Sequence, residues 1–146
     1  MIALVQRVLQ AQVVIDGATV GAITQGLLVL VCAEITDDDT HAARLVDKVL
    51  KLRIFADEAG KMNRSVQDIG GGLLIVSQFT LAADCTGGNR PSFKGAASAE
   101  QGQRLYETVL KLARERHAIV ESGRFGADMQ VHLVNDGPVT IPFRLA

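Results

Sequence analysis

The first third of the chain consists largely of apolar runs separated by turn signals, which is typical of β-strands. Residues 1–14 are expected to form one strand, and Asp16-Gly17 is a turn signal before residues 19–23, which should return as the second half of a hairpin. Residues 26–32 (GLLVLVC) are apolar at both alternating sets of positions, which indicates a strand covered on both faces. The pattern therefore predicts a β-rich start with a deeply buried third strand.

Two later segments repeat apolar residues at helical spacing. The first helix is expected to begin at Thr36, which forms a capping-box pattern with Asp39; its buried positions are Leu45, Val46, Val49, Leu50 and Leu52. The second helix is expected to begin at Ser98, with Gln101 in the matching position; its buried positions are Leu105, Val109, Leu112 and Ala113.

Further strands are expected around these helices, at residues 53–56, 72–81, 118–121, 128–134 and 139–145, and a loop rich in glycine and polar residues at 82–96. Because the helices occur singly between groups of strands, the chain is predicted to be an α/β or α+β layered domain. The pattern does not fix the order of the strands.

Composition narrows the class of protein. The 146 residues are 48% hydrophobic and 21% charged, enough for a proper core and far from the composition of a disordered chain. Fifteen Lys and Arg stand against sixteen Asp and Glu, so there is no global basic field to hold long nucleic acids, and DNA is not an expected partner. The longest apolar run, residues 27–33, is too short for a membrane span. With only two cysteines, the chain is expected to be cytoplasmic.

The chain lacks the short motifs that identify common cofactor and metal sites. It has no glycine-rich dinucleotide fingerprint, no phosphate-loop lysine, and no Cys-x-x-Cys or His-Glu-x-x-His pattern. His41, His117 and His132 are widely separated, with no carboxylate at ligand spacing. We therefore expect no cofactor and no metal. Cys85 lies in the polar loop without a neighbouring histidine, which favours a free thiol over a thiol nucleophile.

Two segments carry the candidate chemistry. Ser77-Gln78-Phe79-Thr80-Leu81 ends an apolar strand, and is either an ordinary strand end or a terminus that presents N–H groups and hydroxyls to a ligand. Asn135-Asp136-Gly137-Pro138-Val139-Thr140 fits a hairpin turn, although a proline directly after the glycine is awkward in a tight turn. A cis Gly137–Pro138 bond would leave both carbonyl oxygens on one side, where they could probe a ligand by shape alone.

Together these segments resemble the two motifs of the D-aminoacyl-tRNA deacylase family. The resemblance extends to residues 1–8 (MIALVQRV), 53–55, 60–63, 90–93 (RPSF) and 123–129 (GRFGADM). It covers the chain from end to end, and the joint occurrence of these motifs is far more specific than any one of them. It implies a single domain over residues 1–146 with an α/β fold, in which a mostly antiparallel or mixed β-sheet and two main helices form β/β/α layers.

The resemblance implies a homodimeric hydrolase that cleaves the ester between a D-amino acid and the terminal adenosine of tRNA, a proofreading step in translation. Its partner would be the acceptor end of tRNA, with glycyl-tRNA mischarged on tRNA-Ala as a second substrate and L-aminoacyl esters rejected. In this family the Gly-Pro peptide is cis. Gly137 and Pro138 would be the chirality filter, reaching into the pocket of the other subunit, and Arg7 would help hold them across the interface. Phe125 and Met129 are expected to contribute to substrate binding.

Ser77, Gln78, Phe79 and Thr80 are the candidate catalytic residues. Neither motif supplies a strong general base, but an aminoacyl ester is already activated and the neighbouring ribose hydroxyl can help to orient or activate water. We assign stabilisation of the oxyanion to the N–H groups of Phe79 and Thr80. For the Thr80 hydroxyl we prefer a positioning role over a nucleophilic one, because no base adjoins it in the sequence.

Three alternatives stay open on the sequence. A non-enzymatic dimeric ligand-binding module would use the same sheet surfaces, and a thiol hydrolase would depend on Cys85. A trans Gly137–Pro138 bond would favour achiral or L-alanyl substrates. In the loop, Arg90 and Lys94 either meet phosphates of the acceptor end or are solvated charges.

Overall fold

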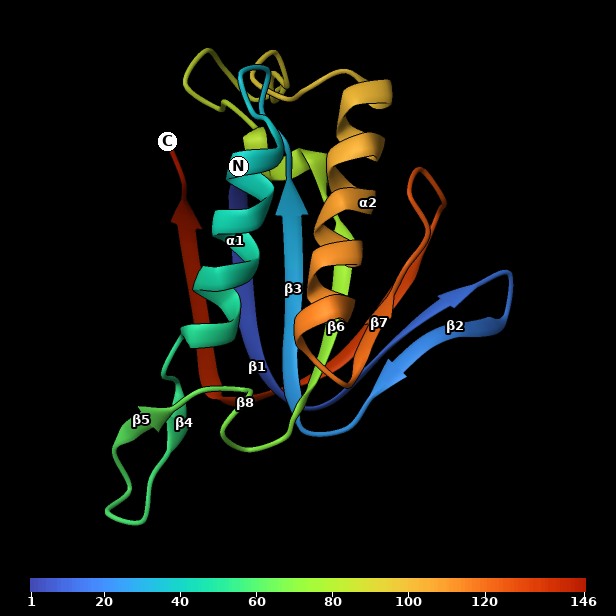
Figure 1. The fold of residues 1–146 in the computed structure, drawn as a ribbon. Coiled ribbons are helices and arrows are strands. Elements are labelled where there is room, and N and C mark those ends of the chain that lie inside the picture. The colour runs from blue at the N-terminus through green and yellow to red at the C-terminus, as the bar shows by residue number, and fades with distance from the viewer.

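The computed structural model describes all of residues 1–146. In chain order its elements are β1 (Ile2–Ile15), β2 (Ala18–Ile23), β3 (Gly26–Cys32), α1 (Asp39–Lys51), β4 (Phe55–Ala56), β5 (Met62–Arg64), β6 (Gly72–Ser77), the 3-10 helix η1 (Phe79–Ala82), α2 (Ala99–Arg116), β7 (Val120–Ser122) and β8 (Gln130–Arg144). The long helices α1 and α2 stand between groups of strands, as the periodicity predicts (Figure 1).

β1 is the strand around which the sheet is assembled. Its first half, Ile2–Val8, pairs antiparallel with β3, and its second half, Ala11–Ile15, pairs antiparallel with β2. β8 runs antiparallel to β1 along nearly its whole length. β6 joins β3 and β7 joins β6, both in parallel. The result is one six-stranded mixed sheet in the order β2-β1-β3-β6-β7, with β8 paired to β1.

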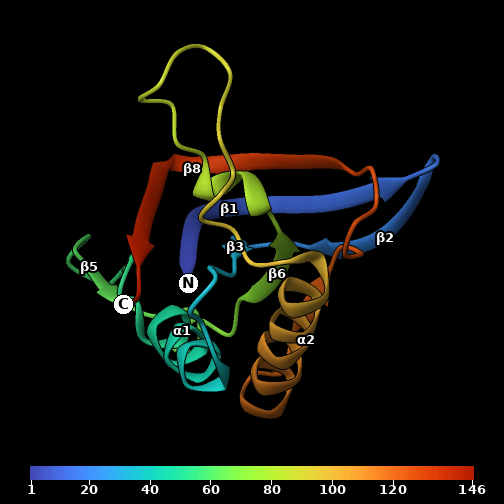
Figure 2. The ribbon, with the colours of Figure 1, turned by 90° about the horizontal axis from the view of Figure 1, so that it is seen from above.

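The sheet is buried on both of its faces, which explains the uniformly apolar sequence of β3. The helix-side core lies under α1 and α2 and includes Val5, Val29, Leu45, Leu73 and Leu105. The strand-side core lies on the opposite face and comprises Val8, Ala11, Val13, Ile23, Leu28, Leu74 and Val76. Figure 2 shows the helices on one side of β3 and β6, with β1 and β8 on the other. The predicted fold class, a mixed sheet and two helices in β/β/α layers, is confirmed.

α1 begins two residues later than its expected cap allows. The carboxylate of Asp38 accepts hydrogen bonds from the N–H groups of Thr40 (2.9 Å) and His41 (3.2 Å). The His41 ring returns the contact, because its Nδ1 accepts the Asp38 N–H over 3.2 Å. This is a complete capping box with Asp38 as the N-cap. The prediction of Thr36 as the capping residue was therefore wrong.

α2 begins after Ser98 as predicted. The Ser98 hydroxyl accepts a hydrogen bond from the N–H of Gln101 over 3.2 Å. The Gln101 side chain does not return to Ser98, since its amide donates to the carbonyls of Ile35 (3.2 Å) and Asp37 (3.0 Å). It thereby fastens the start of α2 to the loop that precedes α1. Neither helix has the combination of length and apolarity that a crossing of the membrane requires.

Among the strand boundaries that differ from expectation, two lie at the candidate motifs. β6 ends at Ser77 instead of residue 81, because the chain turns into η1 at Phe79. The strands expected at 128–134 and 139–145 are one strand, β8, so the hairpin interpretation was wrong. Residues 136–139 instead form a bulge opposite the single residue Arg7 of β1.

Tyr106 joins α2 to the sheet. It is the only tyrosine of a chain that has no tryptophan. Its hydroxyl donates to the carbonyl of Ile75 in β6 over 2.7 Å. The residue is 4% exposed, and this burial raises the pKa of Tyr106 to about 12.

We expect the fold to lose stability as the pH rises through the alkaline range. In the unfolded chain the Tyr106 hydroxyl ionises near the ordinary value of ~10, whereas its pKa in the folded chain is about 12. The unfolded state therefore loses this proton first, so the free energy of unfolding falls between these two values. Denaturant melts across this range should show the loss, and Tyr106→Phe should reduce it. The near-ultraviolet absorbance of tyrosinate reports this residue alone, and a native titration midpoint at the ordinary value would contradict the burial argument.

Candidate active site

An apolar cavity of about 350 Å³ opens at the edge of the sheet where the parallel strands β3 and β6 end. It is lined by Met1 and the end of β3 (Val31, Cys32, Ala33), by the end of β6 (Ser77, Gln78, Phe79), by the start of α2 (Ala97, Ser98, Ala99, Gly102, Tyr106) and by the turn before β8 (Phe125, Gly126). Ligand sites of α/β sheets typically lie outside the carboxyl ends of parallel strands. The topology and the cavity therefore mark the same edge as the candidate site.

The first motif forms one wall of this cavity. Ser77 is the last residue of β6, and its parallel partner in β3 is Val31. Beyond it, the Gln78 N–H donates to the Val31 carbonyl over 2.7 Å, which holds the chain against β3 as it turns into η1. Cys32 adds a contact from its Sγ to the carbonyl of Phe79 at 3.5 Å. The end of β3 thus positions the whole motif.

Thr80 follows directly after this wall and presents the hydroxyl. The side-chain amide of Gln78 donates a hydrogen bond to Thr80 Oγ1. An amide is not a general base, and no histidine or carboxylate contacts this oxygen, so the geometry contains no activated nucleophile. The first N–H that donates within η1 belongs to Leu81, which bonds to the Gln78 carbonyl over 3.1 Å. The N–H groups of Phe79 and Thr80 consequently have no acceptor inside the helix.

Phe125 forms the wall that faces α2. Its ring centroid lies 6.1 Å from that of Tyr106. Gly102, one helical turn before Tyr106, faces this ring, and a Cβ there would lie at ordinary contact distance, 3.4 Å, from Phe125 Cζ. Phe125 is predicted through the family resemblance, whereas no motif in the sequence predicts Gly102 or Tyr106. Their spacing on one face of α2 was the available signal.

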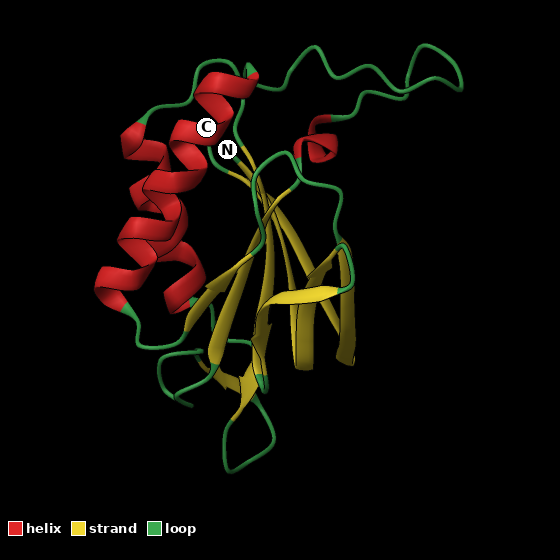
Figure 3. Cartoon of the chain, turned by 90° about the vertical axis from the view of Figure 1, so that its right-hand side faces the viewer, coloured by secondary structure: helices red, strands yellow, loops and turns green.

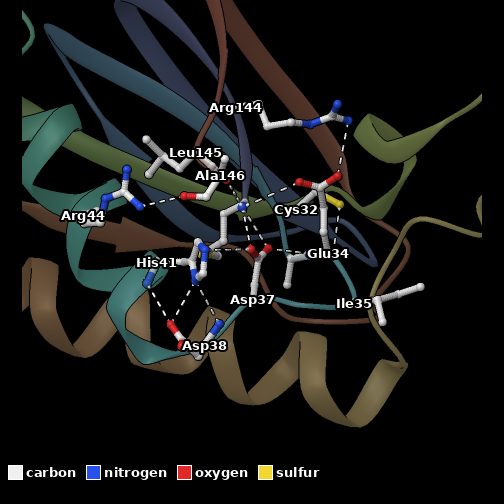
Figure 4. Close-up of polar contacts among 12 residues, drawn as sticks. Cys32, Glu34, Ile35, Asp37, Asp38, His41, Arg44, Arg144, Leu145 and Ala146 are labelled. Carbon is white, nitrogen blue, oxygen red and sulfur yellow. Dashed lines mark hydrogen bonds and ion pairs between the residues drawn. The ribbon is translucent and has the colours of Figure 1, made fainter.

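Met1 and Cys32 line the cavity beside a buried ionic cluster (Figure 4). The α-ammonium of Met1, a residue 1% exposed, donates to Asp37 Oδ1 over 2.8 Å and to the carbonyl of Leu145 over 3.0 Å. Asp37 also accepts the N–H of Glu34 over 2.6 Å. These bonds satisfy a carboxylate that would otherwise be costly to bury. Burial, reinforced by the charge of Glu34, raises the pKa of the Cys32 thiol, which keeps this thiol protonated and unreactive.

The exposed cysteine of the chain lies outside the cavity. Cys85 is exposed in the loop between η1 and α2 and does not line the cavity. No group of three or more His, Cys, Asp or Glu side chains is arranged to hold a metal ion.

The second motif is held by Arg7. The Gly137–Pro138 peptide bond is cis, which resolves the isomer that the sequence left open. Arg7 Nε donates to the carbonyl of Asp136 over 3.1 Å and lies 3.4 Å from its carboxylate, while Nη1 donates to the carbonyl of Ile54 over 2.7 Å. Arg7 therefore braces the Gly-Pro segment of its own chain from the opposite strand.

Asn135 closes the base of the bulge. Its side-chain Oδ1 accepts the N–H of Val139 over 3.2 Å, and its Nδ2 donates to Thr140 Oγ1 over 2.9 Å. Gly137 and Pro138 themselves are exposed at the tip. The segment is thus fixed at its base while its tip faces outward.

Within one chain the two motifs lie at opposite ends of the sheet. Arg7 pairs with Leu27 at the start of β3, whereas the cavity lies beyond Cys32 at the end of that strand. Roughly 17 Å of extended strand separates them. Met129 also lies apart from the cavity, packed on the strand-side core. The cavity lining therefore contains Ser77, Gln78, Phe79 and Phe125, and does not contain Thr80, Arg7, Met129, Gly137 or Pro138.

Comparisons with known proteins agree over the full chain. The family D-Tyr-tRNA(Tyr) deacylase matches residues 4–144. A D-aminoacyl-tRNA deacylase of Paracidovorax citrulli is 68% identical over 146 residues, which are 100% of this chain and 94% of that protein. A solved structure of a c-Myc DNA unwinding element binding protein is 41% identical, covers 100% of this chain and 99% of its own, and has a TM-score of 0.94.

A further solved structure, of a probable eukaryotic D-amino acid tRNA deacylase, is 17% identical and covers 97% of both chains with a TM-score of 0.82. At that identity it shows the shared fold alone. The family match and the close relative together show that this chain belongs to the D-Tyr-tRNA(Tyr) deacylase family.

Two cavity-lining glycines should respond to alanine with opposite signs. Gly102→Ala should raise the free energy of unfolding by about 1 kcal/mol, because alanine is the better helix former and its methyl group would make an ordinary contact with Phe125. Gly126→Ala is the matched control. Gly126 has a φ of +76°, so alanine there should lower the free energy of unfolding by about 1–2 kcal/mol. Chemical denaturation measures the free energy of unfolding of both variants. A loss of stability in Gly102→Ala would show that the Phe125 ring packs too closely against α2 to admit a methyl group.

Proposed function

We propose that this chain hydrolyses the ester bond of D-aminoacyl-tRNA and releases the free D-amino acid and tRNA. Family membership gives the chemistry, and the observation that carries the proposal is the cavity wall made by the first motif. Phe79 is part of that wall and Thr80 follows it directly in the chain, which supports assigning the oxyanion donors and the positioning hydroxyl to these two residues. This arrangement suits an already activated ester, for which placement and oxyanion stabilisation are sufficient.

The acceptor end of tRNA is the macromolecular partner in this proposal, with its terminal adenosine in the cavity. The volume, about 350 Å³, is in the range of small-molecule sites. Aromatic walls from Phe79, Tyr106 and Phe125 suit the faces of a purine. A cytoplasmic location follows from a tRNA substrate.

In the proposed reaction a water molecule attacks the ester carbonyl. Its oxygen forms the new bond to carbon, the ribose oxygen leaves, and one water proton ends on that oxygen. The developing oxyanion is stabilised by the N–H groups of Phe79 and Thr80, each worth about 2.7–4 kcal/mol in favourable cases. The neighbouring ribose hydroxyl orients or activates the water. The Gln78 amide holds the Thr80 hydroxyl as a positioning group, and Ser77 fixes the start of this wall.

The chirality filter is proposed to come from a second copy of the chain. Gly137 and Pro138 are exposed, and they lie at the far end of the sheet from their own cavity. In a homodimer their carbonyls would accept the amino group of the substrate in the partner's cavity and leave no space for an L side chain. Glycyl-tRNA mischarged on tRNA-Ala would pass this filter, because glycine has no side chain. Arg7 supports the filter at its base, and Phe125, which lines the cavity, is placed among the substrate-binding residues. Met129 packs on the strand-side core, so the substrate contact expected of it is not available in the cavity of its own chain.

D-tyrosyl-tRNA and L-tyrosyl-tRNA, offered side by side to the purified protein, test the proposal directly. We expect release of tyrosine from the D ester alone. Release from both esters would support hydrolase activity but contradict the proposed chirality filter. Release from neither ester would favour a non-enzymatic ligand-binding module.

Gly137→Ala tests the proposed chirality filter in the same assay. The position has a φ of +126°, and a Cβ there would lie 2.9 Å from Val139 Cγ2 and 3.0 Å from Arg7 Nη2. We expect the ratio of D to L release to fall. Gly17→Ala is the matched control, because Gly17 also has a positive φ (+78°) but nothing lies within 4 Å of a Cβ at that position.

Thr80 variants test positioning against covalent catalysis. Thr80→Ala should lower kcat about ten- to a hundredfold, which corresponds to one lost hydrogen bond in the transition state. Thr80→Ser keeps the hydroxyl and should retain most of the activity. Mass spectrometry of the enzyme quenched during turnover provides the second readout, and an aminoacyl group trapped on Thr80 would exclude the positioning role.

A further inference from the structure

The segment that links η1 to α2, residues 83–97, forms an arm that stands away from the domain. Figure 3 shows it as a long loop that extends beyond the end of the sheet. A short antiparallel bridge closes it, with mutual N–H to carbonyl bonds of 2.8 and 2.9 Å between Asp84 and Ser92. Its second end is tied to the cavity edge, because the Ala97 N–H donates to the Ala33 carbonyl over 2.9 Å. The arm is therefore anchored beside the cavity.

An aromatic pair joins the cavity to this arm. Phe79 and Phe93 contact each other edge to face, with ring centroids 5.1 Å apart. Phe79 lines the cavity yet is 58% exposed, and Phe93 is 36% exposed. Two aromatic rings left in water next to a ligand cavity indicate a contact surface. The pair continues the aromatic lining of the cavity outward along the arm.

The arm is also locally cationic in a chain whose net charge is −1. Arg90 and Lys94 are exposed and take part in no ion pair. The single carboxylate of the arm, Asp84, is engaged internally, since its Oδ1 accepts the N–H and hydroxyl of Thr86 over 2.9 and 2.7 Å. Exposed aromatic rings beside free cations fit a partner with flat bases and phosphates, the surface of single-stranded nucleic acid.

We propose that Phe79 and Phe93 form a stacking platform for the unpaired nucleotide that precedes the terminal adenosine of the tRNA, with Arg90 and Lys94 contacting its phosphates. This inference rests on the proposed function, because it follows the strand outward from an adenosine seated in the cavity. The base of the nucleotide before that adenosine then lies outside the cavity, beside Phe79 and Phe93. The platform reads no base identity, since every base offers a flat face.

The test compares two esters of the same D-amino acid, D-tyrosyl-tRNA and D-tyrosyl-adenosine, which lacks all preceding nucleotides. Phe93→Ala should lower kcat/KM for the tRNA ester about five- to a hundredfold, the range expected for one lost stacked base. The loss should appear in KM, and hydrolysis of the adenosine ester should not change. Phe93→Trp should retain the tRNA activity. Met62→Ala is the matched control, because Met62 is 51% exposed on the β5 hairpin at the opposite end of the molecule (Figure 1).

Arg90→Gln and Lys94→Gln separate charge from stacking. Each should weaken binding of uncharged tRNA and make it less dependent on salt concentration. Phe93→Ala should weaken this binding without removing its salt dependence. Uncharged tRNA carries no ester, so its binding can be measured even if the wild-type chain cleaves neither substrate. Failure to cleave either ester would contradict the proposed function but would leave this test of the platform valid.

Three results would overturn the platform. If Phe93→Ala lowered kcat/KM equally for both esters, Phe93 would be a residue that supports the catalytic wall. No loss on the tRNA ester together with unchanged tRNA binding would show that the arm does not touch the strand. A change in the mass of Phe93→Ala in light scattering would assign the arm to an interface between copies of the chain.

Discussion

The hydrogen bonding of β1 is the constraint on which the rest of the structure depends. This strand of 14 residues pairs on one edge with β3 along its first half and with β2 along its second half, and on the other edge it pairs with β8. Met1, at its beginning, lines the cavity, and Arg7, farther along, braces the Gly-Pro bulge. β1, with Met1 directly before it, therefore reaches both the cavity and the Gly-Pro bulge, although these lie at opposite ends of the sheet.

Burial on both faces gives this arrangement its stiffness. β3 and β6 are covered by helices on one side and by the curved strands on the other, so neither can shift without opening a core. The end of β3 in turn fixes the first motif through the bond from the Gln78 N–H to Val31. A site that relies on backbone N–H groups for catalysis needs such rigidity, because backbone donors cannot adjust as side chains do.

Local sequence signals predicted the elements well and their junctions less well. The helices and the buried strand β3 follow from periodicity, which is a property of neighbouring residues. The cap of α1 was misassigned because Thr36, Asp37, Asp38 and Asp39 are all plausible acceptors. Only the folded chain shows that Asp37 is used by the Met1 ammonium, which leaves Asp38 for the helix.

The candidate site was predictable where a motif carries it and hidden where distant segments meet. Ser77, Gln78 and Phe79 of the first motif and Phe125 were found from the sequence, and these four line one cavity, whereas Thr80 is not part of its lining. Met1, Gly102 and Tyr106 were missed because they reach the cavity from elements far along the chain from the first motif, Met1 from the start of the chain and the other two from one face of α2. The bulge in β8 was taken for a hairpin because turn residues look alike whether or not the chain reverses. Its pairing with β1 on both sides distinguishes the two.

That pairing has a consequence for how such a protein can diverge. Because β1 sets the register of each half of β8 independently, residues between Asn135 and Thr140 can be gained or lost without moving any other hydrogen bond of the sheet. The distance to which the Gly-Pro tip extends is therefore independent of the strand pairing of the sheet. Selection can tune what the tip touches by changing its length, while the residues that build the core stay as they are.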